Sequence, residues 1–238
     1  MENDKYFALI EEFETSKKLI DLGFGELQNI SLSNNFYFLP FQLLSQGFER
    51  FLKAYICLKH FEQYDTFPLF KEIKDKLGHD LEKLLKEILK KYYTKDSRVQ
   101  FVCDDDFLKN DKEFKELLSI ISEFGKFGRY YNFDVITGKT KIDENPKVLW
   151  EQYEGKIMKQ NNVLEKLTNP DLSDEFYQSI NKHIIVIFEK FVSALSRQLT
   201  FSGFGELSNQ MTFCALSDFS NLHNDDFGDT DYRIKITK

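Results

Sequence analysis

The sequence predicts an all-α fold: an up-down helical bundle with extra N- and C-terminal helices and a short extended tail. Apolar residues recur every three or four positions through most of the chain, which is the period of an amphipathic helix. With 42% hydrophobic and 30% charged residues among 238, the composition is that of a globular protein able to bury a core. We expect residues 1–202 to form a single domain and residues 203–238 to form the tail.

The first predicted helix lies near the N-terminus. Its apolar face carries Tyr6, Leu9, Ile10, Phe13 and Ile20. We expect this helix to end at Gly23 and Gly25, because glycine readily adopts the positive φ angles that close helices.

The second predicted helix has the strongest pattern in the chain. Its apolar residues follow a 4-3-4-3-4-3 spacing: Tyr37, Phe41, Leu44, Phe48, Phe51, Tyr55 and Leu58. Such a seam is typical of core packing between helices. Two more amphipathic helices are predicted, from Asp80 to about Tyr92 and from about Phe114 to Phe124, with a loop at "CDDD" (103–106) between them.

The second half predicts a helix over about 147–167 and a long helix after Ser173, which is a good N-cap. In the tail, "MTFCALSDF" (211–219) and "YRIKITK" (232–238) alternate apolar and polar residues, which indicates short strands or an extended arm. "GFGELQN" (23–29) returns as "GFGELSN" (203–209), either as a glycine helix stop used twice or as the trace of a duplication.

The bulk composition excludes several classes of function. The net charge of −7 argues against a broad nucleic-acid-binding surface, although a local basic cleft, or one formed by two subunits, remains open. Three cysteines outside any CxxC pattern disfavour a disulfide framework and a structural zinc site, so we expect no metal and no cofactor. The chain has neither a secretory signal nor an 18-residue apolar run, which predicts a cytoplasmic protein without membrane contact.

Three segments together suggest a family. They are "LLSQGFERFLKAYICLKH" (43–60), "LGHDLEKLLKEI" (77–88) and "FGKFGRYYNFD" (124–134). Over about residues 35–135 this arrangement resembles the HEPN superfamily of small helical bundles, found in prokaryotic toxins and phage abortive-infection proteins. The resemblance implies a homodimer from a phage-defence or toxin–antitoxin system. Its implied partners are RNA, a cognate antitoxin or a nucleotidyltransferase.

The resemblance also bears on activity. Catalytic members of the superfamily cleave RNA as dimers, using an arginine followed after a short spacer by a histidine. Arg129 stands in the matching place, but positions 134–136 hold Asp, Val and Ile. The RNase motif is therefore degenerate, and the resemblance implies binding of RNA, a nucleotide or a protein partner without catalysis.

Two other functions stay open. A metal-independent endoribonuclease could use Asp134 as the base that accepts the 2′-hydroxyl proton and Arg129 to stabilise charge on phosphorus, with Tyr130, Tyr131 or a partner subunit as the acid. A helical scaffold unrelated to the superfamily is the third possibility. In a structural interpretation, Arg129 forms an ion pair with Asp134 or with Glu49 that locks two helix ends together.

Further candidates come from the first two segments. Glu49 and Lys53 are spaced i,i+4 with the acid first, the order favoured for an ion pair on a helix. His79 precedes Asp80 at a helix start, where it serves either as a base oriented by a carboxylate or as part of a helix cap. The candidate catalytic residues are thus Arg129, Asp134 and Tyr130. The candidate binding residues are Glu49, Lys53, His79 and Tyr131.

Overall fold

The structure is a computed structural model that describes residues 2–31, 33–69, 71–139, 145–160, 170–201 and 206–233, and every regular element in these ranges is helical. The α-helices are α1 (Glu2–Gln28), α2 (Phe38–Tyr64), α3 (Leu81–Glu87), α4 (Val99–Asn110), α5 (Lys112–Lys126), α6 (Tyr131–Ile136), α7 (Pro146–Gln160), α8 (Pro170–Phe201) and α9 (Glu206–Ser220). Short π-helices, η1 (Glu72–Leu77) and η2 (Ile88–Tyr92), flank α3, and a 3-10 turn, η3 (Gly128–Tyr130), precedes α6. The predicted all-α class is confirmed.

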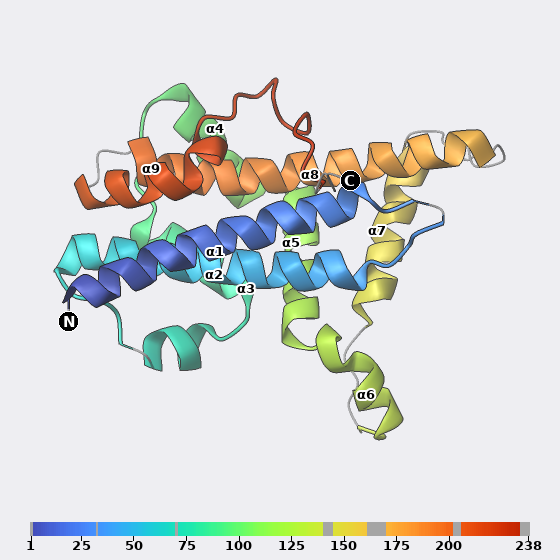
Figure 1. The fold of residues 1–238 in the computed structure, drawn as a ribbon, viewed down its shortest axis with the longest axis horizontal. Coiled ribbons are helices and arrows are strands. Elements are labelled where there is room, and N and C mark those ends of the chain that lie inside the picture. The colour runs from blue at the N-terminus through green and yellow to red at the C-terminus, as the bar shows by residue number, and fades with distance from the viewer. Residues whose placement is uncertain are drawn as a thin grey trace, which may run out of the picture.

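The long helices set the shape of the bundle. Helices α1, α2, α8 and α9 run side by side along the long axis, and α5 and α7 run across them (Figure 1). Helix α5 packs on α2, α3, α7 and α8, and its far end leads into α6, which projects from the bundle (Figure 1). None of the helices in the described part of the chain has the length and apolarity that a membrane span requires.

The core forms around the apolar seam of α2. All seven residues of the predicted seam are buried, so this prediction is confirmed. The Phe48 ring lies 5.0 Å from that of Phe188 and 5.3 Å from that of Phe191, and Phe114 of α5 stacks on Phe191 at 5.0 Å. Aromatic pairs at these separations stabilise a core beyond the burial of their area. The seam therefore joins α2 to α5 and α8.

The glycines of α1 do not end it. The predicted stop at Gly23 and Gly25 is wrong, because the helix continues to Gln28. Both glycines instead permit close packing. A Cβ on Gly23 would lie 2.7 Å from Leu44 Cδ2, and one on Gly25 would lie 2.6 Å from the Tyr232 carbonyl oxygen. Residues 206–209 of the second copy of the motif belong to α9, and its Gly203 and Gly205 lie outside the described residues.

The C-terminal region also differs from its prediction. The expected strand or extended arm at 211–219 is wrong, because these residues belong to α9. Thr212, Ala215, Leu216 and Phe219 are buried at helical spacing, and α9 packs on α1 and α8. After α9 the chain returns without regular structure, and Tyr232 donates a hydrogen bond to Glu189 at 2.7 Å. Of "YRIKITK", residues 234–238 lie outside the described residues.

The acidic segment "CDDD" is helical rather than a loop, since it lies within α4. Asp104 is buried and accepts two hydrogen bonds from Arg197 of α8, from Nε at 2.8 Å and from Nη2 at 2.7 Å. Asp105 pairs with Lys109 at i,i+4. A buried charge needs such a partner, so the Arg197–Asp104 ion pair fixes α4 on α8.

The two helices predicted for the second half of the chain are also present. Helix α7 starts close to the expected position, and α8 begins at Pro170, before the predicted N-cap at Ser173.

The contact between α1 and α2 at Gly47 gives a testable prediction. A Cβ there would lie 2.8 Å from Ile20 Cγ1 and 3.1 Å from the Ile20 backbone nitrogen, so Gly47→Ala forces two helices apart. We expect it to lower the free energy of unfolding by about 1–2 kcal/mol, as overpacking outweighs the gain in helix propensity.

Gly155→Ala in α7 is the matched control, because a Cβ there meets nothing within 4 Å. It should raise the free energy of unfolding by roughly 0.5–1 kcal/mol. Urea denaturation measures both variants, and a Gly47→Ala variant as stable as Gly155→Ala would contradict the close packing.

Candidate functional site

Arg129 lies just beyond the end of α5, in the η3 turn. Its Nη2 donates a hydrogen bond to the carbonyl oxygen of Gly125, at 3.0 Å in the last turn of α5. An arginine in this place satisfies a carbonyl that has no partner within the helix. Gly125 itself packs tightly on α2, since a Cβ there would lie 3.3 Å from Ser45 Cβ. The glycine-rich segment thus ends α5 and holds it against α2.

The ion pair expected for Arg129 does not form. Asp134 instead pairs with Lys139 at 2.7 Å, and Glu49 pairs with Lys53 and His79. The Nε of Arg129 is buried and has no hydrogen-bond partner. The guanidinium is therefore held in place at one atom and lacks a carboxylate among the described residues.

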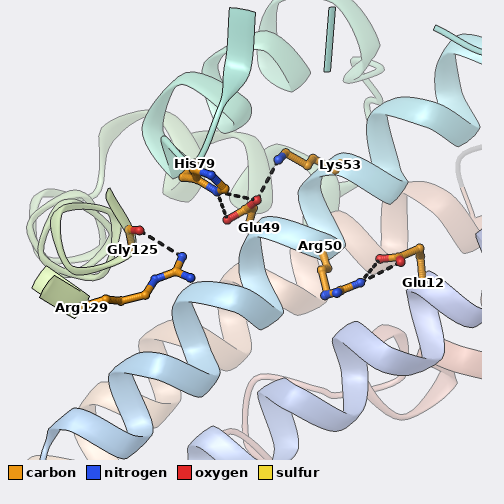
Figure 2. Close-up of polar contacts among 7 residues, drawn as sticks. All are labelled: Glu12, Glu49, Arg50, Lys53, His79, Gly125 and Arg129. Carbon is orange, nitrogen blue, oxygen red and sulfur yellow. Dashed lines mark hydrogen bonds and ion pairs between the residues drawn. The ribbon is translucent and has the colours of Figure 1, made fainter. Parts of the chain in front are cut away.

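Glu49 organises the centre of the candidate site, as Figure 2 shows. Its carboxylate accepts a hydrogen bond from Lys53 Nζ at 2.7 Å and hydrogen bonds from His79 Nδ1 at 2.9 and 3.0 Å. The Glu49 side chain is 14% exposed and that of His79 is 62% exposed. Because a carboxylate can only accept, the imidazole donates through Nδ1 and leaves Nε2 free for another group. The structure thus brings together three of the predicted binding residues.

The loop before α3 presents His79. Asp80 caps α3 by accepting a hydrogen bond from the Lys83 backbone nitrogen at 3.0 Å, as the sequence predicts for a residue at a helix start. His79 takes no part in this cap and reaches α2 instead. Its orienting carboxylate is therefore Glu49, from another helix, and not the neighbouring Asp80.

A cavity of about 420 Å³ lies over these side chains, and we call it the Glu49 cavity. Its polar lining is formed by Glu12, Gln46, Glu49, Arg50, Lys53, His79 and Arg129. Arg50 Nη1 donates to both carboxylate oxygens of Glu12 in α1, at 2.7 and 2.8 Å (Figure 2). The sequence analysis missed Glu12 and Arg50, because their pairing depends on how α1 packs against α2.

The charges in the Glu49 cavity favour an anion. Arg50 and Lys53 pair with the carboxylates of Glu12 and Glu49, which leaves the Arg129 guanidinium as the cation in the lining without a carboxylate partner among the described residues. Cys57 also lines the cavity, but burial raises the pKa of its thiol to about 11, so it is not a ready nucleophile. The arrangement can hold a phosphate-like group and offers His79 Nε2 as a proton acceptor.

A second cavity, of about 340 Å³, lies on the other side of Arg129, and we call it the aromatic cavity. Its lining includes Phe36, Tyr37, Phe38, Phe124, Arg129 and Tyr131. Tyr131 thus shares a cavity with Arg129, whereas Tyr130 is exposed. Within the described residues, no hydrogen bond or ion pair joins Arg129, Asp134 and Tyr130, the three predicted catalytic residues.

In the described ranges, no group of three or more His, Cys, Asp or Glu side chains could hold a metal ion. Comparison with known proteins finds no matching family model, no matching curated protein and no matching solved structure. The function must therefore be inferred from the residues themselves.

Arg129 and Arg197 should differ in how much each contributes to the free energy of unfolding. Arg129→Ala removes one hydrogen bond to a helix end and should cost about 1 kcal/mol of unfolding free energy. Arg197→Ala leaves the Asp104 charge buried and unpaired and should cost roughly 3–5 kcal/mol. Chemical denaturation of both variants makes the comparison. Equal losses would mean that Arg129 is a structural residue.

Proposed function

We propose that this protein is a HEPN-like, dimeric binding protein of a prokaryotic defence or toxin–antitoxin system, and that it acts by binding rather than by catalysis. The helical bundle and the arginine at the end of α5 support the HEPN-like assignment. Positions 134–136, where a histidine is expected after Arg129, hold Asp, Val and Ile, which supports a role without catalysis. The observation that carries the proposal is the surface around α6.

Helix α6 has no buried residue, although its sequence "YNFDVI" is largely apolar. Phe133 is 64% exposed and Ile136 is 77% exposed. Exposed apolar side chains continue onto the neighbouring segments, and together they form what we call the α6 surface: Phe36, Phe38, Phe127, Tyr130, Phe133, Val135 and Ile136. Contiguous exposed apolar surface of this kind marks sites of protein association.

The occupant we propose for the α6 surface is a second copy of the chain. Helix α6 projects from the bundle, which makes it accessible to a second copy (Figure 1). A two-fold interface uses the same patch on both subunits, and aromatic residues such as Phe133 and Tyr130 are typical of its buried centre. The aromatic cavity, which holds Tyr131 and Arg129, would then lie beside the interface.

The dimer is tested by placing charge on the α6 surface. Phe133→Asp combined with Ile136→Asp should convert a dimer to a monomer and weaken association at least about tenfold, since truncating one central residue often costs about 2 kcal/mol. Analytical ultracentrifugation over a concentration series measures this shift. Phe7→Asp is the control, because Phe7 is 66% exposed on α1. A wild-type protein that stays monomeric throughout, or a control that dissociates equally, would overturn the dimer.

A ribonuclease remains the second candidate function, because His79 and Arg129 line one cavity. The histidine missing after Arg129 in sequence could be replaced by His79, whose ring Glu49 orients through Nδ1. His79 Nε2 would accept the proton of the attacking 2′-hydroxyl, and Arg129 would stabilise the charge that develops on the phosphate. As the 2′-oxygen bonds to phosphorus and the P–O5′ bond breaks, solvent water would protonate the leaving 5′-oxygen.

Expression in bacteria separates this candidate from a binding role. An active ribonuclease should inhibit growth, and His79→Ala or Arg129→Ala should each relieve the inhibition, with intact cellular RNA as the readout. His183→Ala is the matched control, because His183 also pairs with a carboxylate, that of Glu113 at 3.3 Å, on a different part of the bundle. Growth and RNA unaffected by the wild-type protein would count against catalysis and favour binding.

A further inference from the structure

A third cavity lies farther along α2 and shares no residue with the Glu49 cavity. It has a volume of about 500 Å³, and we call it the lysine cavity. Its lining includes His60, Tyr64, Lys86, Lys90, Lys91 and Tyr92. Small-molecule sites commonly occupy roughly 300–1,000 Å³, so its size suits a ligand such as a nucleotide.

Both π-helices found in the described residues border the lysine cavity. The η1 segment contributes Ile73 and Leu77, and η2 contributes Lys90, Lys91 and Tyr92. A π-helical turn has poorer hydrogen-bond geometry than an α-helical turn, and such turns occur frequently at functional sites. Here η2 continues α3 without a break and directs its side chains toward the cavity.

The net charge of the lysine-cavity lining is positive, because it contains four lysines, Lys83, Lys86, Lys90 and Lys91, against two glutamates, Glu72 and Glu87. The two carboxylates that line it are engaged: Glu87 pairs with Lys91, and Glu72 accepts a hydrogen bond from the Leu69 backbone nitrogen at 3.2 Å. Lys86 and Lys90 form no ion pair within the described residues, and their i,i+4 spacing places two like charges on one helix face. Such a pair destabilises a helix by a few tenths of a kcal/mol unless an anion lies between the charges.

Aromatic rings form the opposite wall. Tyr64 is 55% exposed at the end of α2, where Asp65 turns the chain with a φ of 55°. The His60 ring lies 4.7 Å from that of Tyr64, and its Nδ1 donates a hydrogen bond to the Thr66 carbonyl oxygen at 2.7 Å. His60 thus contacts the Tyr64 ring, and the exposed part of Tyr64 is an aromatic surface of the kind on which nucleobases stack.

We propose that the lysine cavity binds a nucleoside 5′-phosphate, with the phosphate between Lys86 and Lys90 and the base stacked on Tyr64. Ammonium groups bind phosphate oxygens by charge-assisted hydrogen bonds, and an aromatic face accepts any base. The ligand is either a free nucleotide or the phosphorylated 5′ end of an RNA strand, since both present this chemistry. This site does not depend on the function proposed above.

Calorimetric titration of the full chain with ADP tests the site, with inorganic pyrophosphate as a second probe. Replacing both Lys86 and Lys90 by Ala should weaken ADP binding at least about tenfold. Tyr64→Ala should weaken ADP binding about fivefold or more and leave pyrophosphate binding unchanged, because only the base stacks. All three residues are exposed or at the cavity rim, so these variants should keep the far-UV circular dichroism of the wild type.

The control variant replaces Lys112 and Lys115, two exposed lysines of α5, by Ala. It removes the same amount of positive charge as the Lys86 and Lys90 variant. It should change ADP affinity less than about twofold, since charges beyond a Debye length are screened. An oligonucleotide with and without a 5′-phosphate identifies the source: binding of ADP alone indicates a free nucleotide, and binding of the phosphorylated strand alone indicates an RNA end. Absence of binding by ADP and by the phosphorylated strand at millimolar concentration, or an equal loss in the control, would overturn the proposal.

Discussion

The close approach of α1 and α2 at Gly47 is the constraint on which the arrangement of this protein depends. A side chain at this position would collide with Ile20, so the two helices can lie together only because the residue is glycine. Their contact sets Glu12 of α1 opposite Arg50 of α2 and so forms one wall of the Glu49 cavity. It also leaves the seam of α2 free to face α5 and α8, where the aromatic core forms.

Helix α2 carries two stripes with the same helical spacing. The buried seam fixes the position of the helix, and a second stripe, rotated toward the solvent, lines both polar cavities with Glu49, Lys53, Ile56, His60 and Tyr64. The steps along this second stripe are again three or four residues, so its members share a face. Helix α2 therefore contributes side chains both to the core and to the two polar cavities. Because the core fixes the position of α2, it also fixes the side chains of α2 that line the cavities.

The sequence predicted those features that depend on local pattern. The seam of α2, the Glu49–Lys53 pair and the cap by Asp80 follow from spacing within one helix, and each is present. The prediction of a strand at 211–219 was wrong, because Leu216 and Phe219 are buried against α1 and α8 as parts of a helix. Alternation of apolar and polar residues over a short segment does not reveal such packing between distant helices.

The contact of Glu49 with His79, across 30 residues, could not be read from spacing, since it needs the position of α3 on α2. That position is fixed by a junction of three helices: Ser122 of α5 accepts a hydrogen bond from the Leu81 backbone nitrogen at 3.0 Å, and Asp80 pairs with Lys126 at 3.6 Å. His79 directly precedes Asp80, and Arg129 lies three residues after Lys126, so both are close in sequence to this junction. Helix α6 buries none of its residues and begins at Tyr131, two positions after Arg129. The η3 turn thus connects α6 directly to the Glu49 cavity, whose lining includes Arg129.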